Sequence, residues 1–317
     1  MRYTFLFSFF LCQLIGLRSQ TKIPFLFRKQ EEKTTKHIHK YLSHDTLVET
    51  SQANIHIYYS NKPNMPYLLL LHGMGIDAKT NWYKQISNLS KHYNLLVPDL
   101  IYFGTSTAKE NNYSVEFQVE QIHELIKKLN INPKINVMGF SYGGLTAAVY
   151  NEFFNAEVNK LIIIDGPVKF FSGQMADSLA HIVGVPSMSN IIIPQTVSEY
   201  KAMEKAVLSK KIPTTKKFKR KLIHYYFTPT LEPRQLEINY LIEHQNRYQF
   251  YDYNIDKTPT LLIWGAKDGV VPLTVGEKLH EYFPKTTQLL TFKKGKHDSH
   301  FRYSKKVNKA VVNFLKN

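Results

Sequence analysis

One serine of this chain stands in a setting that suits a nucleophile. Residues 139–143 are Gly-Phe-Ser-Tyr-Gly, with a strand-forming run before them at 134–138 and a helix-forming run after them at 145–154. This is the G-x-S-x-G motif in the strand–turn–helix context that it requires. The two glycines allow so tight a turn to close because they carry no side chain. A helix that begins just after Ser141 directs its N–H groups and the positive end of its dipole at the serine. The pattern predicts that Ser141 is a catalytic nucleophile.

A second glycine-containing turn follows the apolar run 67–71. A run without polar interruption suits a strand that is buried on both faces of a parallel sheet. The turn at 72–75 is His-Gly-Met-Gly. Glycines let the backbone approach a ligand closely, and a backbone N–H in such a turn can donate to an oxyanion. We therefore predict an oxyanion hole formed by the N–H groups of Met74 and Tyr142.

Strand-like and helix-like runs alternate on both sides of these motifs, which predicts an α/β fold with a mostly parallel sheet and helices on both faces. The predicted strands are 46–49, 54–59, 67–71, 93–98, 134–138, 160–164, 259–264 and 287–292. The predicted helices are 30–42, 81–92, 114–129, 145–154 and 304–315. The run 114–129 has one apolar face, and Ser114 is its expected N-cap.

The alternation stops at residue 168 and resumes at about residue 257. Within this stretch the sequence predicts helices at 174–183, 197–209, 215–227 and 231–248. The stretch is rich in aromatic residues. We expect most of them to serve packing and the remainder to line an apolar, partly aromatic pocket. These residues are Phe170, Phe171, Tyr200, Tyr225, Tyr226, Phe227, Tyr240 and Tyr248.

The motifs in their chain order resemble the α/β-hydrolase superfamily. His-Gly-Met-Gly at 72–75 is followed by Pro-Asp-Leu at 98–100 and by Gly-Phe-Ser-Tyr-Gly-Gly at 139–144. The resemblance covers roughly residues 50–166 and 257–317. It implies a mostly parallel eight-stranded sheet with an inserted helical cap. The implied divisions are 1–20 for a signal peptide or anchor, 21–50 for an extension with the first strand, 51–167 and 257–317 for the hydrolase core, and 168–256 for the cap.

The resemblance also implies the acid of a catalytic triad. Residues 265–272, Gly-Ala-Lys-Asp-Gly-Val-Val-Pro, resemble the family's acid loop after the penultimate strand, which makes Asp268 the expected acid. Its role is to accept the imidazole Nδ1–H and to stabilise the imidazolium. Asp165 competes, because some family members carry the acid after the strand that follows the elbow helix. Asp99 is a third candidate, although an aspartate in that position more often bonds to loop backbone.

The base is expected in the loop after the last strand, where the family carries it. Residues 293–300 are Lys-Lys-Gly-Lys-His-Asp-Ser-His. The resemblance assigns the base to His297 and leaves His300 as a neighbour. Lys296 stands where the family often has glycine. A metal site made of His297, Asp298 and His300 is disfavoured, because zinc sites need a complete ligand shell.

The order Ser141, Asp268, His297 along the chain is that of the α/β hydrolases. It predicts a serine hydrolase that cleaves a carboxylic ester of a small, largely apolar substrate through an acyl-serine intermediate, with no cofactor and no metal. A carbon–carbon bond hydrolase or an aminopeptidase of the same fold is the alternative. A hydrolase fold used only for binding is the hypothesis from another class.

Charge and the amino-terminal sequence bear on partners and location. The net charge is +16, but the lysines are scattered and match no nucleic-acid-binding motif, so we predict no nucleic-acid partner. Residues 1–20 combine Arg2 with the apolar run 5–17, which is typical of a signal peptide and short for a membrane span. The expected location is secreted or periplasmic, with N-terminal or peripheral membrane association as the alternative. Cleavage would remove Cys12, the one cysteine, and with it any thiol chemistry.

Overall fold

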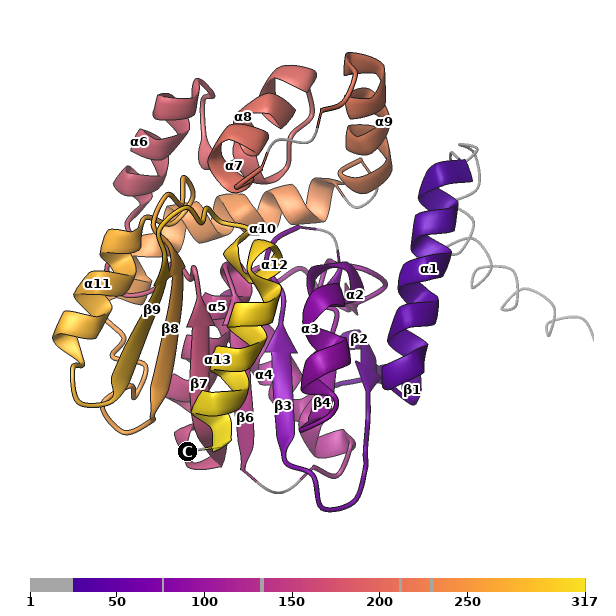
Figure 1. Cartoon of the computed structure of the whole chain (residues 1–317), viewed down its shortest axis with the longest axis vertical. Coiled ribbons are helices and arrows are strands. Elements are labelled where there is room, and N and C mark those ends of the chain that lie inside the picture. Colours follow the sequence, from indigo (N-terminus) through magenta and orange to yellow (C-terminus); the bar gives the residue numbers. More distant parts are fainter. Residues whose placement is uncertain (1–24, 76, 132–133, 211–212, 229–230, 317) are drawn as a thin grey trace, which may run out of the picture.

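The computed structural model describes residues 25–316 except 76, 132–133, 211–212 and 229–230 (Figure 1). The predicted signal peptide at 1–20 lies outside the described residues. A twisted sheet forms the middle layer, with the strand order β1-β2-β4-β3-β6-β7-β8-β9 and the short β5 beside β2. Its strands are β1 His44–Glu49, β2 Ala53–Tyr59, β3 Tyr67–Leu71, β4 Asn94–Pro98, β5 Thr107–Ala108, β6 Ile135–Phe140, β7 Val158–Ile164, β8 Thr260–Gly265 and β9 Thr287–Phe292.

The sheet is parallel from β4 to β9, and β1 and β2 are antiparallel to their neighbours. Every predicted strand is present, so the prediction of a mostly parallel sheet is confirmed, with β5 as an additional two-residue strand. The central strands β4, β6 and β8 are buried throughout, in agreement with their continuous apolar sequences. Their carboxyl ends meet at one edge of the sheet.

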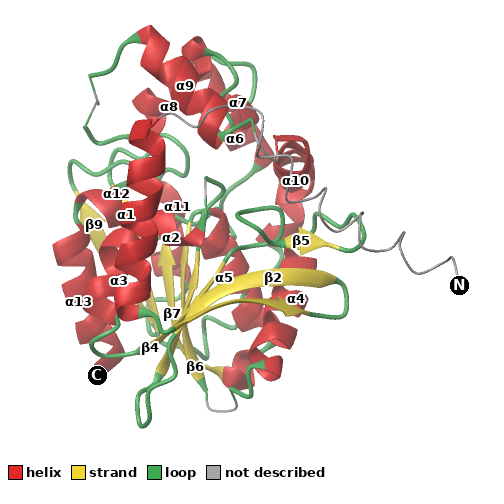
Figure 2. Cartoon of the chain, turned by 90° about the vertical axis from the view of Figure 1, so that its right-hand side faces the viewer, coloured by secondary structure: helices red, strands yellow, loops and turns green. Residues whose placement is uncertain are grey.

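Helices cover both faces of the sheet, as Figure 2 shows edge-on. The helices of the core are α1 Phe25–Tyr41, α2 Ala78–Asn81, α3 Tyr83–Leu89, α4 Val115–Lys128, α5 Tyr142–Phe153, η2 Asn155–Glu157, α11 Leu273–Tyr282, α12 Ser299–Arg302 and α13 Ser304–Lys316. Successive residues of β6 serve opposite faces. Val137 packs in the cluster under α4 and α5, and Met138 packs in the cluster under α3 and α13.

Two details show where local sequence was sufficient and where it was not. Ser114 caps α4 as predicted, since its Oγ accepts the Phe117 N–H at 3.2 Å. Helix α11 was not predicted, because Gly276 interrupts its sequence and glycine is a poor helix former. A Cβ on Gly276 would lie 2.7 Å from the Trp264 ring, so close packing on β8 explains the glycine.

A group of helices lies above the carboxyl ends of the strands (Figure 1). We call it the upper helical layer. It consists of α6 Gly173–Val183, α7 Met188–Ile192, α8 Val197–Val207, α9 Lys216–Tyr226, α10 Leu231–His244 and η3 Gln245–Gln249. Each predicted helix of this stretch is present, and α7 is additional. Helix α10 runs between the other upper helices and the sheet.

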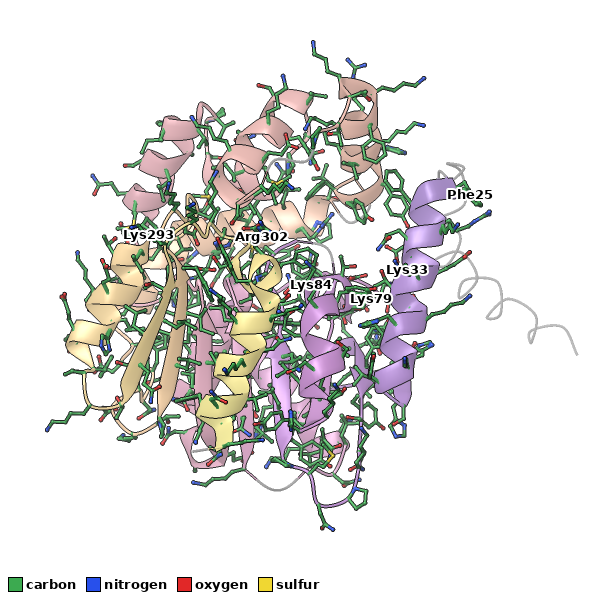
Figure 3. The ribbon with its side chains drawn as sticks, in the orientation of Figure 1. Phe25, Lys33, Lys79, Lys84, Lys293 and Arg302 are labelled. Atoms are coloured by element: carbon green, nitrogen blue, oxygen red, sulfur yellow. The ribbon has the colours of Figure 1, made fainter. Side chains whose placement is uncertain are left out.

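The first described helix, α1, joins the core to the upper helical layer. Its Ile38 is fully buried in the core cluster that includes α3. Its Phe27 is buried near the other end and stacks on Tyr225 of α9 with ring centroids 5.0 Å apart. Phe25, labelled in Figure 3 at the start of α1, is 68% exposed. Within the described part of the chain, no helix combines the length and apolarity needed to cross a bilayer.

Candidate active site

Ser141 lies in a sharp turn between β6 and α5. Its φ is 54°, a left-handed conformation that a residue with a side chain seldom adopts. The flanking glycines are required by space. A Cβ on Gly139 would lie 1.9 Å from the Gly143 carbonyl oxygen, and a Cβ on Gly143 would lie 2.1 Å from the Leu71 carbonyl oxygen. The turn therefore has the geometry expected for a nucleophile elbow.

The structure brings His297 and Asp268 to Ser141. His297 Nε2 lies 2.8 Å from Ser141 Oγ, and His297 Nδ1 lies 2.7 Å from Asp268 Oδ2. These partners assign the tautomer, because the carboxylate can only accept, so Nδ1 carries the proton and Nε2 accepts from the serine hydroxyl. All three side chains are buried or nearly so. They come from the ends of three parallel strands, β6, β8 and β9.

The acid is oriented by its own loop. Asp268 Oδ1 accepts the N–H groups of Val270 at 2.7 Å and Val271 at 3.0 Å. The second oxygen, Oδ2, is therefore left to face His297.

The loop predicted to form half of an oxyanion hole lies beside Ser141. A Cβ on Gly73 would lie 3.0 Å from Cβ of Ser141, and Met74 and Tyr142 line the same pocket as Ser141. Among the described residues, neither the Met74 N–H nor the Tyr142 N–H has a hydrogen-bond acceptor. Both donors are thus available to a ligand atom above the serine.

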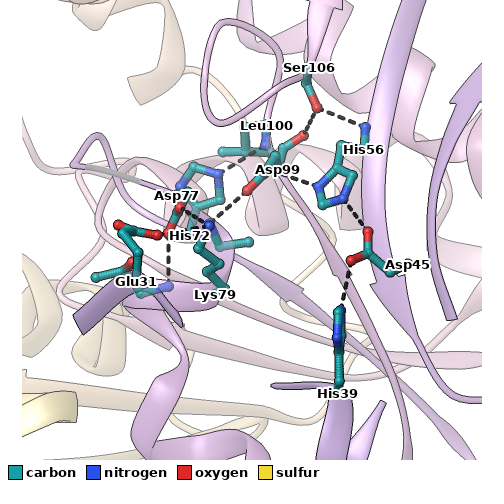
Figure 4. Close-up of polar contacts among 12 residues, drawn as sticks. Glu31, His39, Asp45, His56, His72, Asp77, Lys79, Asp99, Leu100 and Ser106 are labelled. Atoms are coloured by element: carbon teal, nitrogen blue, oxygen red, sulfur yellow. Dashed lines mark hydrogen bonds and ion pairs between the residues drawn. The ribbon is translucent and has the colours of Figure 1, made fainter. Parts of the chain in front are cut away.

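His72 holds this loop from the core side. It is fully buried, its Nδ1 lies 2.8 Å from the Gly73 carbonyl oxygen, and its Nε2 accepts the Leu100 N–H at 2.9 Å. The second contact, drawn in Figure 4, fixes the tautomer with the proton on Nδ1. Burial lowers the pKa of His72, which keeps the ring neutral.

Asp99, a candidate acid in the sequence, lies away from Ser141 and bonds to structural groups. Its Oδ1 accepts the Ala78 N–H at 2.8 Å, and its Oδ2 lies 2.9 Å from His56 Nδ1 (Figure 4). Burial by itself would lower the pKa of His56, but the hydrogen bonds and charges of Asp99 and Asp45 raise it. This arrangement agrees with the interpretation of Asp99 as a residue that orders loop backbone.

Asp165, the competing acid, is adjacent to the three residues but bonds elsewhere. Its carboxylate oxygen, one from Asp268 and a nitrogen of His297 all lie within 4.8 Å of one another. Its Oδ1 accepts the Gly265 N–H at 2.9 Å, and its Oδ2 has no partner among the described residues. Complete burial, together with the negative charge of Asp268, raises the pKa of Asp165 well above its ordinary value.

The neighbours of His297 in the sequence serve packing and loop contacts. His300 is buried against the Phe140 ring, with centroids 3.9 Å apart. Burial, with the nearby His297, lowers the pKa of His300 to about 3. Asp298 Oδ1 accepts the Ser209 N–H at 3.0 Å. His300 and Asp298 are therefore engaged elsewhere than with His297.

A pocket lies between Ser141 and the upper helical layer. It has about 480 Å³ of empty space, including its open mouth. The lining is almost wholly apolar. It consists of Met74, Ser141, Tyr142, Pro167, Phe171, Gly173, Ala176, Met188, Ile192, Ile238, Leu241, Ile242, Gln245, Val270 and Val271.

The chain matches a known protein family over most of its length. The α/β hydrolase fold model matches residues 66–302, which is more than half of the chain. The chain belongs to the α/β hydrolase family. The recognition and the fold class predicted from the sequence are thus confirmed.

Individual members of the α/β hydrolase family are distant in sequence. The human monoacylglycerol lipase ABHD6 is 24% identical over 257 residues, which cover 79% of this chain and 75% of the lipase. A bacterial membrane phospholipase A has a TM-score of 0.75 at 19% identity and covers 98% of both chains. The meta-cleavage product hydrolase CumD of Pseudomonas fluorescens IP01 has a TM-score of 0.66 at 21% identity, covering 87% of this chain and 98% of that one. The relatives include lipases and hydrolases of meta-cleavage products, and the chain is an enzyme of the esterase and lipase type.

Several residues that line the pocket of this α/β hydrolase were not predicted from the sequence. Of the aromatic residues expected in part to line a pocket, Phe171 alone does so among the described residues. Tyr225 and Tyr226 pack on Phe27 instead. The actual lining uses aliphatic residues of α10 at helical spacing. That spacing at Ile238, Leu241 and Ile242 was a signal present in the sequence.

Proposed function

We propose that this enzyme cleaves carboxylic esters with Ser141 as nucleophile, His297 as general base and Asp268 as the acid that orients it. The hydrogen bonds that join these three side chains, with Ser141 lining an apolar pocket, are the observation that supports the proposal. Ser141 Oγ attacks the carbonyl carbon while His297 Nε2 takes its proton. His297 then protonates the leaving alcohol. Water, deprotonated by the same imidazole, hydrolyses the acyl-serine in the second half of the reaction.

The oxyanion of both tetrahedral intermediates is proposed to accept hydrogen bonds from the Met74 and Tyr142 N–H groups. Their freedom from other acceptors and their place beside Ser141 support this role. The Tyr142 N–H also lies at the amino-terminal end of α5, where the helix dipole favours negative charge. Removal of one such donor costs roughly 3–4 kcal/mol of transition-state stabilisation in known cases.

The pocket suggests the acyl part of the substrate. Its lining is apolar, so the acyl chain of an ester fits there better than a charged or strongly polar group. Burial of such a chain contributes roughly 0.8 kcal/mol per methylene group. We infer that kcat/KM rises with acyl length until the pocket is filled.

The alternative reactions need charges that this pocket lacks. An acidic ring-fission product would call for a cation near the serine, and a peptide amino terminus would call for a carboxylate. Among the described residues that line the pocket, none is lysine, arginine, aspartate or glutamate. This lining favours a neutral ester over the carbon–carbon bond hydrolase and the aminopeptidase.

The test is labelling with a fluorophosphonate together with hydrolysis of p-nitrophenyl esters from acetate to palmitate. Wild type and Ser141→Ala are compared, and Ser178→Ala on α6 serves as a matched control on an exposed serine. We expect labelling and turnover in wild type and in the control but not in Ser141→Ala. Labelling without ester turnover would redirect the proposal to carbon–carbon or amide bonds. A folded wild-type protein that does not react would support the binding-protein hypothesis.

We further propose that residues 168–256 act as a cap on a core made of 51–167 and 257–317. The position of the upper helical layer over the strand ends supports this division (Figure 1). Residues 1–20 are proposed to direct secretion or to anchor the protein to a membrane. Amino-terminal sequencing of the protein made in its native host distinguishes cleavage near residues 19–20 from retention of the anchor.

A further inference from the structure

A buried arginine of the upper helical layer contacts the proposed oxyanion loop. Arg234 lies near the start of α10 and is 3% exposed. Its Nη1 donates to the Gly75 carbonyl oxygen at 2.8 Å, and its Nη2 donates to the carbonyl oxygens of Tyr226 and Phe227, both at 3.1 Å. The guanidinium group also lies over the Phe103 ring, 6.0 Å from its centroid. One side chain thus joins α10, the end of α9 and the loop beside the nucleophile.

The loop is held at two carbonyl groups, one on each side of Met74. His72 Nδ1 donates to the Gly73 carbonyl oxygen from the core, and Arg234 donates to the Gly75 carbonyl oxygen from the upper helical layer. Gly73 and Gly75 have unusual backbone freedom, so a loop without these two contacts would sample many conformations. With both carbonyl groups occupied, the backbone on either side of the Met74 N–H is restrained.

The same helix reaches the other proposed donor residue one turn later. Glu237 is fully buried and accepts the Gln118 Nε2–H at 2.9 Å. Its second oxygen and the Tyr142 hydroxyl have no partner of good hydrogen-bond geometry among the described residues, yet the two groups interact. Burial raises the pKa of Glu237 to about 8, while the Tyr142 hydroxyl, Gln118 and the Arg234 charge act in the opposite direction. Helix α10 therefore contacts the Met74 loop through Arg234 and interacts with the side chain of Tyr142 through Glu237.

We propose that Arg234 is a positioning residue that holds the Met74 loop in the conformation that stabilises the oxyanion. This inference rests on the proposed function of Ser141, Met74 and Tyr142. Arg234 does not line the pocket, so its effect falls on the transition state and not on the binding of the acyl chain. The cost of a buried guanidinium group is offset by its three backbone acceptors.

The test compares wild type with Arg234→Lys and Arg234→Gln. Lysine keeps the positive charge, but its single ammonium group cannot donate to three carbonyl groups as the planar guanidinium group does. Glutamine loses both the charge and the planar set of donors. We expect kcat to fall roughly tenfold to hundredfold, less than the ~10²–10³ loss of a donor itself, while KM changes less than threefold. The inhibition constant of a trifluoromethyl ketone with the same acyl chain should rise by the same factor as kcat/KM falls, because its adduct carries the oxyanion.

The matched control is Arg247→Gln, an arginine of the same layer that pairs with Glu116 at 2.8 Å and does not touch the loop. Its kcat should stay within twofold of wild type. If the single Arg234 variants do not fold, the pair Arg234→Met with Glu237→Gln removes both buried charges and allows the same measurement.

The outcomes separate this inference from the function on which it rests. A reactive wild type with folded Arg234 variants of equal kcat, or with unchanged affinity for the ketone, would overturn the inference alone. A rise in KM without a fall in kcat would also overturn it. A wild type that neither hydrolyses esters nor reacts with a fluorophosphonate would overturn the proposed function, and the inference would fall with it.

Discussion

The carboxyl edge of the sheet and the upper helical layer hold the site in different ways. At the edge, Ser141, Asp268 and His297 are the continuation of strands whose side chains are packed in two continuous apolar clusters. The upper helical layer is joined by hydrogen bonds to the backbone of the loops beside these residues. Besides Arg234 on Gly75, the Gly269 N–H donates to the Ala206 carbonyl oxygen at 3.2 Å.

Two further hydrogen bonds join the end of α8, and the residues just after it, to the loop of His297. The Asp298 N–H donates to the Val207 carbonyl oxygen at 3.1 Å, and the Lys296 N–H donates to Ser209 Oγ at 3.0 Å. The loops of both the acid and the base are thus bonded to residues 206–209. Close apolar packing therefore fixes the positions of the strand ends. Hydrogen bonds from the upper helical layer restrain the backbone of the loops that follow those strands.

The largest expected effect lies at the edge of the sheet. His297→Gln keeps most of the side-chain volume but removes the base, so kcat should fall about 10⁶-fold with little change in thermal stability. Stopped-flow measurement of ester hydrolysis, with circular dichroism to verify folding, provides the comparison. Loss of activity below tenfold would contradict the assignment of His297 and would favour another base.

A glycine substitution probes the packing of the edge itself. Gly139→Ala places a Cβ 1.9 Å from the Gly143 carbonyl oxygen, so we expect a loss of more than about 3 kcal/mol in the free energy of unfolding. Gly75→Ala is the matched change in the oxyanion loop, where a Cβ meets no atom within 4 Å. Its unfolding free energy should stay within about 0.5 kcal/mol of wild type. Equal denaturation midpoints for the two variants would contradict the conclusion that Gly139 is tightly packed and Gly75 is not.

The burial of Glu237 on α10 predicts a pH-dependent stability. The pKa of Glu237 is raised to about 8 from an ordinary value of 4.5, so the folded protein binds more protons than the unfolded chain between these values. Stability should therefore decline as pH rises through this window, by at most about 1.4 kcal/mol per pH unit from this group. In Glu237→Gln that part of the decline should vanish. Urea denaturation at several pH values measures the free energy of unfolding of both proteins. The same pH dependence in wild type and Glu237→Gln would contradict this role of Glu237.

The smallest effect is expected at the contact between α8 and the loop of the base. Ser209→Ala removes the hydroxyl that accepts the Lys296 N–H and bonds to Asp298. A net contribution of roughly 0.5–1.5 kcal/mol for one hydrogen bond predicts a twofold to tenfold fall in kcat. Ser178→Ala is the control, since its hydroxyl bonds within α6. An unchanged kcat in Ser209→Ala would limit the influence of the upper helical layer to α10.

Much of the fold was predictable because its signals are local. Every strand except the two-residue β5 was found from short apolar runs, and the elbow was found because one strand, one turn and one helix lie within about twenty residues of sequence. Ser114 and its helix α4 were found for the same reason. Helix α11 was missed, since Gly276 satisfies a contact with Trp264 that no local pattern records.

Local chemistry alone thus specified a serine in a tight turn, a glycine-containing loop after a buried strand, and the alternation of strands and helices. The resemblance of residues 265–272 to the family's acid loop favoured Asp268 over Asp165, but both aspartates follow neighbouring strands, and three-dimensional contact was needed to show that Asp268 faces His297. The function of Arg234 needed it even more, since 159 residues separate it from Gly75. The effect of a buried cation depends on the groups around it. Around Arg234 these groups come from α9, α10 and the loop after β3, which meet only once the chain has folded.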